Sequence, residues 1–262
     1  MRYFLHLSYD GTDYSGWQRQ KNTDNTIQEK LEVIISMVLG KQTTINGCGR
    51  TDAGVHASQY IAHIDVEEEL PKSFCSIVNF HLPKEIVLHD NFLVKDDQHA
   101  RYDAIKRSYE YYMIMERDPF LSRYMTYYGD KYLRLDLLKE AIEITKNYTD
   151  FGKMCKQPDK NKHNICHIYE SGVSWSYDKN RIRIILTADR FLRGMVRIIV
   201  AKALDVASKK LSIKEYQAHL DGSKPRKFQD MAYPQGLYLS KIEYPYFEIK
   251  NNSFLRQEFL MD

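Results

Sequence analysis

The feature that most constrains the fold is an alternation of strand-like and helix-like hydrophobic patterns, which the second half of the chain repeats. Residues Arg2–Tyr9 alternate as in a half-buried strand. The run Thr26-Ile27-Gln28-Glu29 is a capping-box pattern, and an amphipathic helix is expected from there to Val38. Gly40 stands where a left-handed helix end is expected. The chain is therefore expected to mix helices and strands.

The same patterns predict the other elements. Strands are expected at Gln42–Cys48, Ser58–Asp65, Glu85–Val94, Arg107–Met115, Ile168–Trp175, Arg181–Ala188 and Leu237–Tyr244. Helices are expected at Pro71–Phe80, Leu135–Tyr148 and Arg193–Ala207, and a second capping box opens a short helix at Ser212. We expect an α+β fold in which two similar α/β halves, residues 1–100 and 101–262, share a mostly antiparallel central sheet flanked by helices.

Composition excludes few functions. The net charge of +3 permits a nucleic-acid partner without requiring one, and the 20 tyrosines provide side chains that stack and also donate hydrogen bonds. No apolar run approaches the roughly 20 residues of a membrane span. The N-terminal residues pass directly into a strand pattern without the apolar core of a signal peptide. We expect a cytoplasmic protein.

The four cysteines do not form a disulfide framework, and no CxxC pair occurs. One alternative is a zinc site in the second half of the chain, made by Cys155, His163, Cys166 and His167. Their spacing matches no common zinc pattern, and adjacent Cys166 and His167 would chelate one ion awkwardly. Ordinary thiols in a lysine-rich loop are the favoured interpretation, and no metal is expected.

The segment Gly47–Ala57 carries the most chemistry. It places three glycines, a cation, a carboxylate and an imidazole between two predicted strands. Gly49 and Gly54 are expected to allow backbone angles and close approaches that other residues resist. The loop could then press its main chain against a ligand and hold Asp52 forward. By itself the pattern favours an ordinary turn capped by Thr51 or Asp52.

Several strings along the chain, in order, resemble the TruA family of tRNA pseudouridine synthases. The strings are Tyr9-Asp10-Gly11-Thr12, Gly16-Trp17-Gln18-Arg19-Gln20, Thr26-Ile27-Gln28-Glu29, Gly49-Arg50-Thr51-Asp52-Ala53-Gly54-Val55-His56, His99-Ala100-Arg101, Lys106-Arg107-Ser108-Tyr109-Glu110-Tyr111, Phe191-Leu192-Arg193-Gly194-Met195-Val196-Arg197 and Gly236-Leu237-Tyr238-Leu239. The resemblance covers nearly the whole chain and implies the pseudouridine synthase fold.

The resemblance also implies roles for single residues. Asp52 matches the family's essential aspartate, and Arg50 matches the basic residue that helps extrude the target nucleotide. Tyr109 matches the tyrosine that packs against the target base, and Arg197 the arginine that pairs with the catalytic carboxylate. Leu237 falls in the strand that lines the apolar side of the pocket.

Patterns around these residues are compatible with the implied roles. Alternation puts Tyr109 and Tyr111 on one strand face and Tyr112 on the other, so binding and core packing can coexist. Arg197 shares a helical face with Gly194, Ile198 and Ala201, which indicates a packed residue rather than a solvated charge. His56, in a glycine-rich loop, is interpreted as structural.

The implied substrate is uridine at positions 38, 39 and/or 40 of the tRNA anticodon stem-loop. The reaction gains no atom or electron, so no cofactor is expected, and the family is dimeric, so a homodimer is expected. Arg101, Arg107 and Arg193 are candidate RNA contacts, because spread positive charges suit phosphates. They belong to two basic stretches, one formed by Arg101, Lys106, Arg107, Arg117, Arg123 and Lys131, the other by Arg190, Arg193, Lys202, Lys209, Lys210, Lys224, Arg226 and Lys227.

One segment departs from the family pattern. Thr149–Lys156 stands where the family usually has His-Asp-Phe-x-x-Phe, which puts the substrate range in question more than the activity. The alternative to an active enzyme is an RNA-binding module or tRNA chaperone that has lost catalysis. The presence of Asp52, Tyr109 and Arg197 favours the enzyme.

Overall fold

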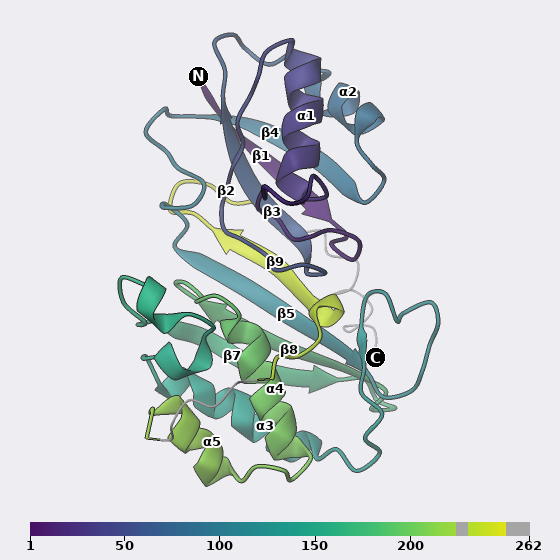
Figure 1. The fold of residues 1–262 in the computed structure, drawn as a ribbon, viewed down its shortest axis with the longest axis vertical. Coiled ribbons are helices and arrows are strands. Elements are labelled where there is room, and N and C mark those ends of the chain that lie inside the picture. Colours follow the sequence, from purple (N-terminus) through teal and green to yellow (C-terminus); the bar gives the residue numbers. More distant parts are fainter. Residues whose placement is uncertain (224–229, 250–262) are drawn as a thin grey trace. The chain divides into compact units, whose positions relative to one another are not determined.

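The computed structural model describes residues 1–223 and 230–249, which form two compact units (Figure 1). Of these residues, unit 1 holds 1–105 and 238–249, and unit 2 holds 106–237. Within the described ranges, no helix is both long enough and apolar enough to cross a bilayer.

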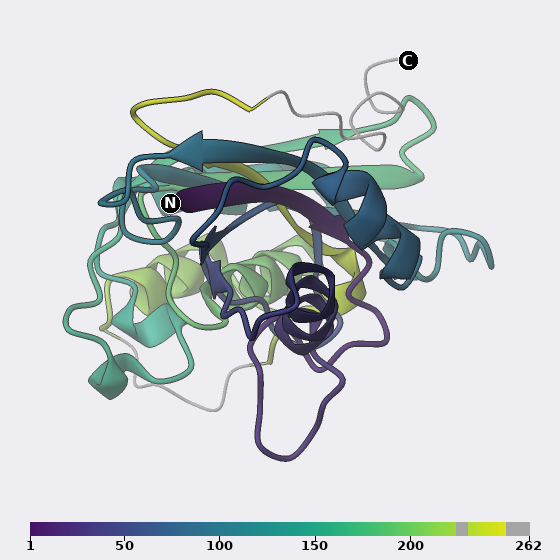
Figure 2. The ribbon, with the colours of Figure 1, turned by 90° about the horizontal axis from the view of Figure 1, so that it is seen from above.

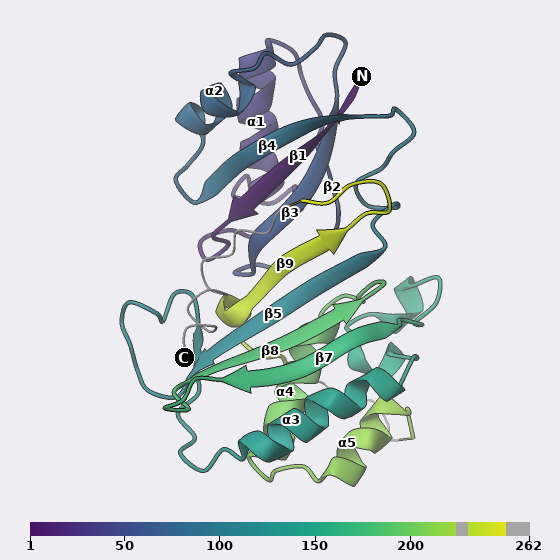
Figure 3. The ribbon, with the colours of Figure 1, turned by 180° about the vertical axis from the view of Figure 1, so that it is seen from behind.

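Unit 1 is a mostly antiparallel sheet with two helices. Its elements are β1 (Arg2–Tyr9), α1 (Ile27–Leu39), β2 (Asn46–Gly47), β3 (His56–Asp65), α2 (Phe74–His81), β4 (Ile86–Val94) and β9 (Leu237–Glu243), which enters the unit at Tyr238. Strand β1 pairs antiparallel with β3 and β4, β2 pairs antiparallel with β3, and β9 pairs parallel with β3. Helix α1 crosses one face of this sheet (Figures 1 and 3).

Unit 2 repeats this combination of mostly antiparallel strands and helices. Its elements are β5 (Lys106–Ile114), β6 (Thr126–Tyr127), α3 (Leu135–Ile144), β7 (Ile168–Trp175), β8 (Arg181–Ala188), α4 (Met195–Ala207), α5 (Ile213–Leu220) and the short 3-10 helix η4 (Pro234–Gly236). Strand β8 lies between β5 and β7 and pairs antiparallel with both, and β6 runs parallel to β5. The helices of unit 2 lie on one side of its sheet (Figure 2). The two units confirm the predicted α+β class with mostly antiparallel strands and flanking helices.

Local sequence signals fix several element ends. Strands β1, β7 and β8 have the predicted bounds. Gly40 ends α1 at φ +64°, as expected for a left-handed cap. The capping box at Ser212 forms completely, because its side chain accepts from Glu215 N while the Glu215 side chain accepts from the Ser212 backbone. At α1, Thr26 accepts from Glu29 N, whereas Glu29 Oε2 lies 3.7 Å from Arg19 Nε.

Several predicted elements are shorter than expected; the helix predicted at Pro71–Phe80, for example, begins at Phe74. The strand predicted at Gln42–Cys48 is reduced to Asn46–Gly47, because the segment before it bonds to side chains of α1 instead of a strand. The helix predicted to reach Tyr148 ends at Ile144, and Thr145 turns its hydroxyl back to Ala141 O at 2.9 Å. The helix predicted from Arg193 begins at Met195.

A buried histidine makes the stability of unit 1 depend on pH. His63 on β3 is 1% exposed, and its Nδ1 accepts a 3.3 Å hydrogen bond from Ala100 N. Burial, with help from the positive charge of Arg2, lowers the pKa of His63 to about 4. Burial likewise lowers the pKa of His6 to about 4. In the unfolded chain a histidine titrates near 6.5.

We predict that acid destabilises the protein between about pH 6.5 and pH 4. In this window the unfolded chain binds more protons than the folded one, so the free energy of unfolding falls as pH falls. Each histidine contributes at most about 1.4 kcal/mol per pH unit. Urea unfolding at several pH values measures the slope. His63→Gln should flatten it because glutamine does not titrate, while its side chain can still accept from Ala100 N. An unchanged slope in His63→Gln would contradict the assignment to this residue.

Candidate active site

Asp52 occupies the first position of a tight turn in unit 1. Val55 N donates to Asp52 O at 3.2 Å, and Gly54, at the third position, has φ +75°. A positive φ at that position favours glycine, so the expectation for Gly54 is confirmed. Asp52 is half-buried and Arg50, two residues earlier, is exposed. The turn therefore carries its carboxylate on a defined backbone.

The main chain of the segment after β1 lies directly against this turn. An added Cβ at Gly11 would lie 2.0 Å from Val55 O, and one at Gly16 would lie 2.6 Å from Thr51 O. Gly16 also has φ +94°. No side chain fits at either position, so both glycines are required for the two backbones to approach.

Hydrogen bonds fix the same contact on both sides of Asp52. Trp17 N donates to Thr51 O at 3.2 Å, and Gly54 N donates to Tyr14 O at 3.3 Å. The buried hydroxyls of Tyr9 and Thr51 are 2.9 Å apart. The residues on either side of Asp52 thus have their backbone groups bound within unit 1, which leaves little freedom in the turn.

The contacts of His56 agree with the structural role that the sequence indicates for it. Its ring is 1% exposed and stacks on Tyr238 with centroids 4.6 Å apart. Nδ1 accepts from Gly11 N at 3.2 Å and lies 3.2 Å from Asp10 Oδ1. The imidazole therefore ties the start of β3 to the segment after β1.

The other glycines of the loop differ in their role. Gly47 faces the stacked rings of Trp17 and Tyr60, and an added Cβ would lie 2.7 Å from Trp17 Cε2. Gly49 has open space around its Cβ position and no positive φ, so the expectation that it provides a special backbone angle or a close approach is wrong. Its carbonyl accepts from Tyr60 Oη at 2.6 Å.

Unit 2 brings two of the recognised strings together. The Tyr109 ring on β5 meets Phe191 edge-on, with centroids 5.2 Å apart. Tyr111 is buried, and its hydroxyl donates to Tyr233 O at 2.9 Å. Tyr112 instead bonds the Glu110 carboxylate through its hydroxyl, which agrees with the predicted alternation of faces. Tyr109 is half-buried.

Arg197 is held by backbone groups in unit 2. Its Nε donates to Ala232 O at 2.7 Å, and Ala232 N donates to Arg197 O at 3.0 Å. Arg197 is half-buried, so it is not a solvated helix charge. Gly194 does not share its helical face, because Gly194 precedes α4 with φ +73° and an added Cβ there would meet Lys156 Cγ at 3.1 Å.

Leu237 follows a glycine that packs closely on β5. An added Cβ at Gly236 would lie 2.6 Å from Tyr112 O and 3.0 Å from Tyr111 Cζ. Leu237 itself is 5% exposed.

The candidate residues are divided between the units: Asp52, Arg50 and Arg101 belong to unit 1, and Tyr109, Arg197, Leu237, Arg107 and Arg193 belong to unit 2.

The candidate phosphate contacts differ in exposure. Arg101 and Arg193 are exposed, whereas Arg107 is half-buried and donates from Nη1 to Asp189 O at 3.0 Å. Arg193 lies beside the loop that follows Gly152: its carbonyl accepts from Lys156 N at 2.9 Å and its Nη1 donates to Gln157 Oε1 at 3.3 Å. Lys224, Arg226 and Lys227 lie outside the described residues.

The zinc alternative finds no support in the geometry. In the part of the chain that the structure describes, no three His, Cys, Asp or Glu residues are arranged to hold a metal ion. Cys155 and Cys166 are fully buried, and burial raises the pKa of Cys166 to about 12. Zinc ligands are thiolates, so this environment opposes metal binding.

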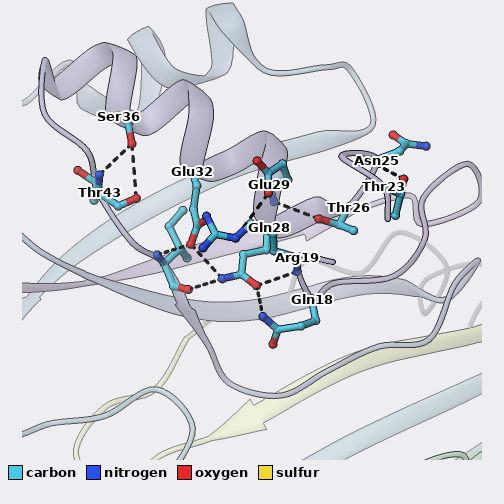
Figure 4. A network of polar contacts seen from close by, with 11 residues as sticks. Gln18, Arg19, Thr23, Asn25, Thr26, Gln28, Glu29, Glu32, Ser36 and Thr43 are labelled. Atoms are coloured by element: carbon cyan, nitrogen blue, oxygen red, sulfur yellow. Dashed lines mark hydrogen bonds and ion pairs between the residues drawn. The ribbon is translucent and has the colours of Figure 1, made fainter. Parts of the chain in front are cut away.

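Sequence reasoning missed two buried polar residues on α1. Gln28 and Glu32 are 7% and 6% exposed and bond the main chain on both sides of the helix (Figure 4). Their spacing of four residues beside the apolar positions Ile27 and Leu31 was the available signal, because it places both side chains next to the buried face.

Comparison with known proteins agrees with this fold and these recognised strings. A family model described as tRNA pseudouridine synthase matches residues 7–103 and 148–245. The chain is 37% identical to tRNA pseudouridine synthase A of Azobacteroides pseudotrichonymphae over 251 residues, which cover 95% of this chain and 99% of the relative. It is 38% identical to the Bacteroides fragilis protein of that name, covering 93% and 96% of the two chains, and 35% identical to the one from Clostridium acetobutylicum, covering 92% and 98%.

The fold and the comparisons together define the class of protein: an RNA-modifying isomerase with an α+β fold. The chain belongs to the tRNA pseudouridine synthase family, and the resemblance seen in the sequence is confirmed.

We predict that the close approach at Gly11 is essential to unit 1. Gly11→Ala places a methyl group against Val55 O and should reduce the free energy of unfolding by about 2–4 kcal/mol, as overpacking against rigid backbone does. Gly49→Ala is the matched control, because its Cβ position is open, and should change stability by less than about 1 kcal/mol. Urea unfolding compares them; equal losses would contradict the packing argument.

Proposed function

We propose that this protein isomerises uridine to pseudouridine at positions 38, 39 and/or 40 of the tRNA anticodon stem-loop, with Asp52 as the essential carboxylate. Membership of the family over nearly the whole chain supports the activity. The observation that carries the choice of residue is the fixed turn at Asp52, whose flanking backbone groups are bound by Trp17 and Tyr14. Preorganised backbone around one acidic group suits a catalytic carboxylate.

The chemistry requires only groups of this kind. The bond between N1 of the base and C1′ of the ribose breaks, the base rotates, and a bond from C5 to C1′ forms. C5 loses its proton and N1 gains one, so no atom or electron is gained overall. An ionised carboxylate can serve this reaction as a nucleophile or as a base for a ribose proton. Neither route needs a cofactor.

We infer that Arg197 has the role that the family resemblance implies for it, which is to pair with the catalytic carboxylate of Asp52. An opposite charge keeps a carboxylate ionised against the desolvation that raises its pKa. The anchoring of Arg197 to Ala232 supports this role, because a fixed guanidinium loses less entropy when it binds. Tyr109 packs against the free base, and Leu237 lines the apolar side of the pocket.

The target base must leave its stack before it can react. We infer that Arg50 helps extrude the nucleotide and fills the vacated space, since its side chain is exposed two residues before the Asp52 turn. Arg101, Arg107 and Arg193 then bind phosphates, which position the RNA without reading its sequence. Arg193 has the strongest support, because Lys153, Lys156, Lys160 and Lys162 are exposed on the adjoining loop.

Two further points belong to the proposal. We infer a homodimer that binds one tRNA across both subunits, which agrees with the general prevalence of twofold oligomers. We also infer that the protein acts in the cytoplasm, where its tRNA substrate occurs.

We predict that Asp52→Asn abolishes pseudouridine formation while tRNA binding stays within a few-fold of the wild type. The amide keeps the shape of the carboxylate but cannot act as nucleophile or base, so the rate should fall by at least about 10³-fold. Purified protein is incubated with unmodified tRNA transcripts, and pseudouridine is mapped by carbodiimide adducts and reverse-transcription stops. Stops at the three candidate positions that vanish in the variant are the expected result.

The same experiment tests the second candidate function, a tRNA-binding module without catalysis. In that case the wild type would bind tRNA tightly, yield no pseudouridine and be indistinguishable from Asp52→Asn. Pseudouridine at undiminished rate in the variant would instead overturn the role of Asp52.

We predict that Arg193→Gln weakens tRNA binding and lowers its salt dependence. Each lost phosphate contact should reduce the slope of log Kd against log salt by about one. Lys139→Gln is the control, because Lys139 is an exposed cation on α3 that already has Glu143 as a partner at 3.8 Å. Filter binding at several salt concentrations measures the slopes, and equal slopes in the two variants would refute a specific contact at Arg193.

A further inference from the structure

Helix α1 turns two buried polar side chains toward the main chain that flanks the Asp52 loop. Gln28 and Glu32 lie one helical turn apart on this helix, and both are almost fully buried. A buried amide or carboxylate is costly unless its hydrogen bonds are satisfied. Their partners include backbone groups of Arg19 and Ile45, which belong to the segments before and after the helix (Figure 4).

The Gln28 amide bridges the two segments. Its Oε1 accepts from Arg19 N at 3.0 Å and from Gln18 Nε2 at 2.6 Å. Its Nε2 donates to Ile45 O at 3.1 Å and to Glu32 Oε1 at 2.9 Å. A backbone N–H on one side and a backbone carbonyl on the other fix which way the amide points.

The Glu32 carboxylate completes the bridge. Oε1 accepts from Ile45 N at 3.0 Å, and Oε2 accepts from Arg19 Nη1 at 2.9 Å. Ile45 is 1% exposed, and its buried backbone N–H and C=O both need hydrogen-bond partners. Side chains of α1 provide these partners in place of a neighbouring strand.

Both bridged segments lead to the turn that holds Asp52. On one side, Gln28 N donates to Trp17 O at 3.0 Å, and Trp17 N donates to Thr51 O at 3.2 Å. On the other side, Ile45 is followed within two residues by Gly47, which packs against Trp17. Thr51 is the residue before Asp52, so two backbone hydrogen bonds lead from Gln28 to the turn. The Gln28 side chain holds the same segment through Arg19 N, two residues after Trp17.

We infer that Gln28 and Glu32 are positioning residues for Asp52: they hold the two segments that brace its turn. The inference rests on the proposed function of Asp52. The inference claims more than a general contribution to stability. Ser36 on the same helix makes the same kind of bond farther from the turn, so it shows what such a bond does when it does not hold the turn. Ser36 Oγ accepts from Thr43 N at 2.9 Å, two residues before Ile45.

The test compares Gln28→Glu with Ser36→Ala. The first change keeps the size of the side chain, removes the donor to Ile45 O and adds a carboxylate beside Glu32. We expect kcat for pseudouridine formation to fall about 10- to 100-fold with KM for tRNA within twofold, the size of loss that small misplacement of a catalytic group causes. Ser36→Ala should lower the melting temperature without changing kcat.

The pH profile separates positioning from structural damage. A carboxyl beside another carboxylate has a raised pKa, and once protonated it can again donate a hydrogen bond. The kcat of Gln28→Glu should therefore recover toward the wild-type value as pH falls from about 8 to 6, relative to wild type at each pH. Glu32→Gln, which keeps an acceptor for Ile45 N, should retain more kcat than Glu32→Ala.

Hydrogen exchange provides a readout that does not depend on activity. Amides of residues 48–55 should exchange faster in Gln28→Glu than in Ser36→Ala. If exchange is faster in Gln28→Glu but the wild-type protein makes no pseudouridine, the proposed function is overturned and the bracing of the turn is supported. Unchanged exchange with unchanged kcat, or kcat losses that track melting temperature equally in both variants, would overturn the inference.

Discussion

The close contact between two main chains, residues 11–17 and 51–55, is the constraint on which the candidate site depends. Gly11 and Gly16 permit it, because the space that a side chain would need is occupied by carbonyl groups of the Asp52 loop. The backbone partners formed there fix the residues beside Asp52 before any ligand arrives. A reacting group held in this way needs little reorganisation when substrate binds, which is a large part of what an enzyme site contributes.

The second unit prepares its residues by different means. Its candidate residues include an aromatic ring, Tyr109, and a cation, Arg197. These side chains are held by a ring contact and by a hydrogen bond to a backbone carbonyl. Phe191 contacts the Tyr109 ring edge-on, and Ala232 O accepts a hydrogen bond from Arg197. Gly236 lets the chain approach β5 closely enough to bury Leu237. Each unit thus organises its own part of the chemistry within its own core, the carboxylate in one and its proposed partners in the other.

The sequence predicts those features that local physics decides. The bounds of β1, β7 and β8 follow from alternation, and the ends of α1 and α5 follow from their caps. Local patterns fail where distant groups replace the expected partner. The strand predicted at Gln42–Cys48 is short because Gln28 and Glu32 satisfy the backbone of Ile45. For the site, the motif strings give the candidate residues, but hydrophobic periodicity does not reveal the buried polar side chains of Gln28 and Glu32 on α1.

The segment that departs from the family pattern can be understood in the same terms. Within Thr149–Lys156, Phe151, Met154 and Cys155 are fully buried, so the departure preserves a small apolar core. Its end is bonded to the Arg193 carbonyl through Lys156 N, which connects it to the string that also contains Arg197. The exposed lysines of this segment, Lys153 and Lys156, therefore lie beside Arg193, the cation that the proposal places against RNA phosphates.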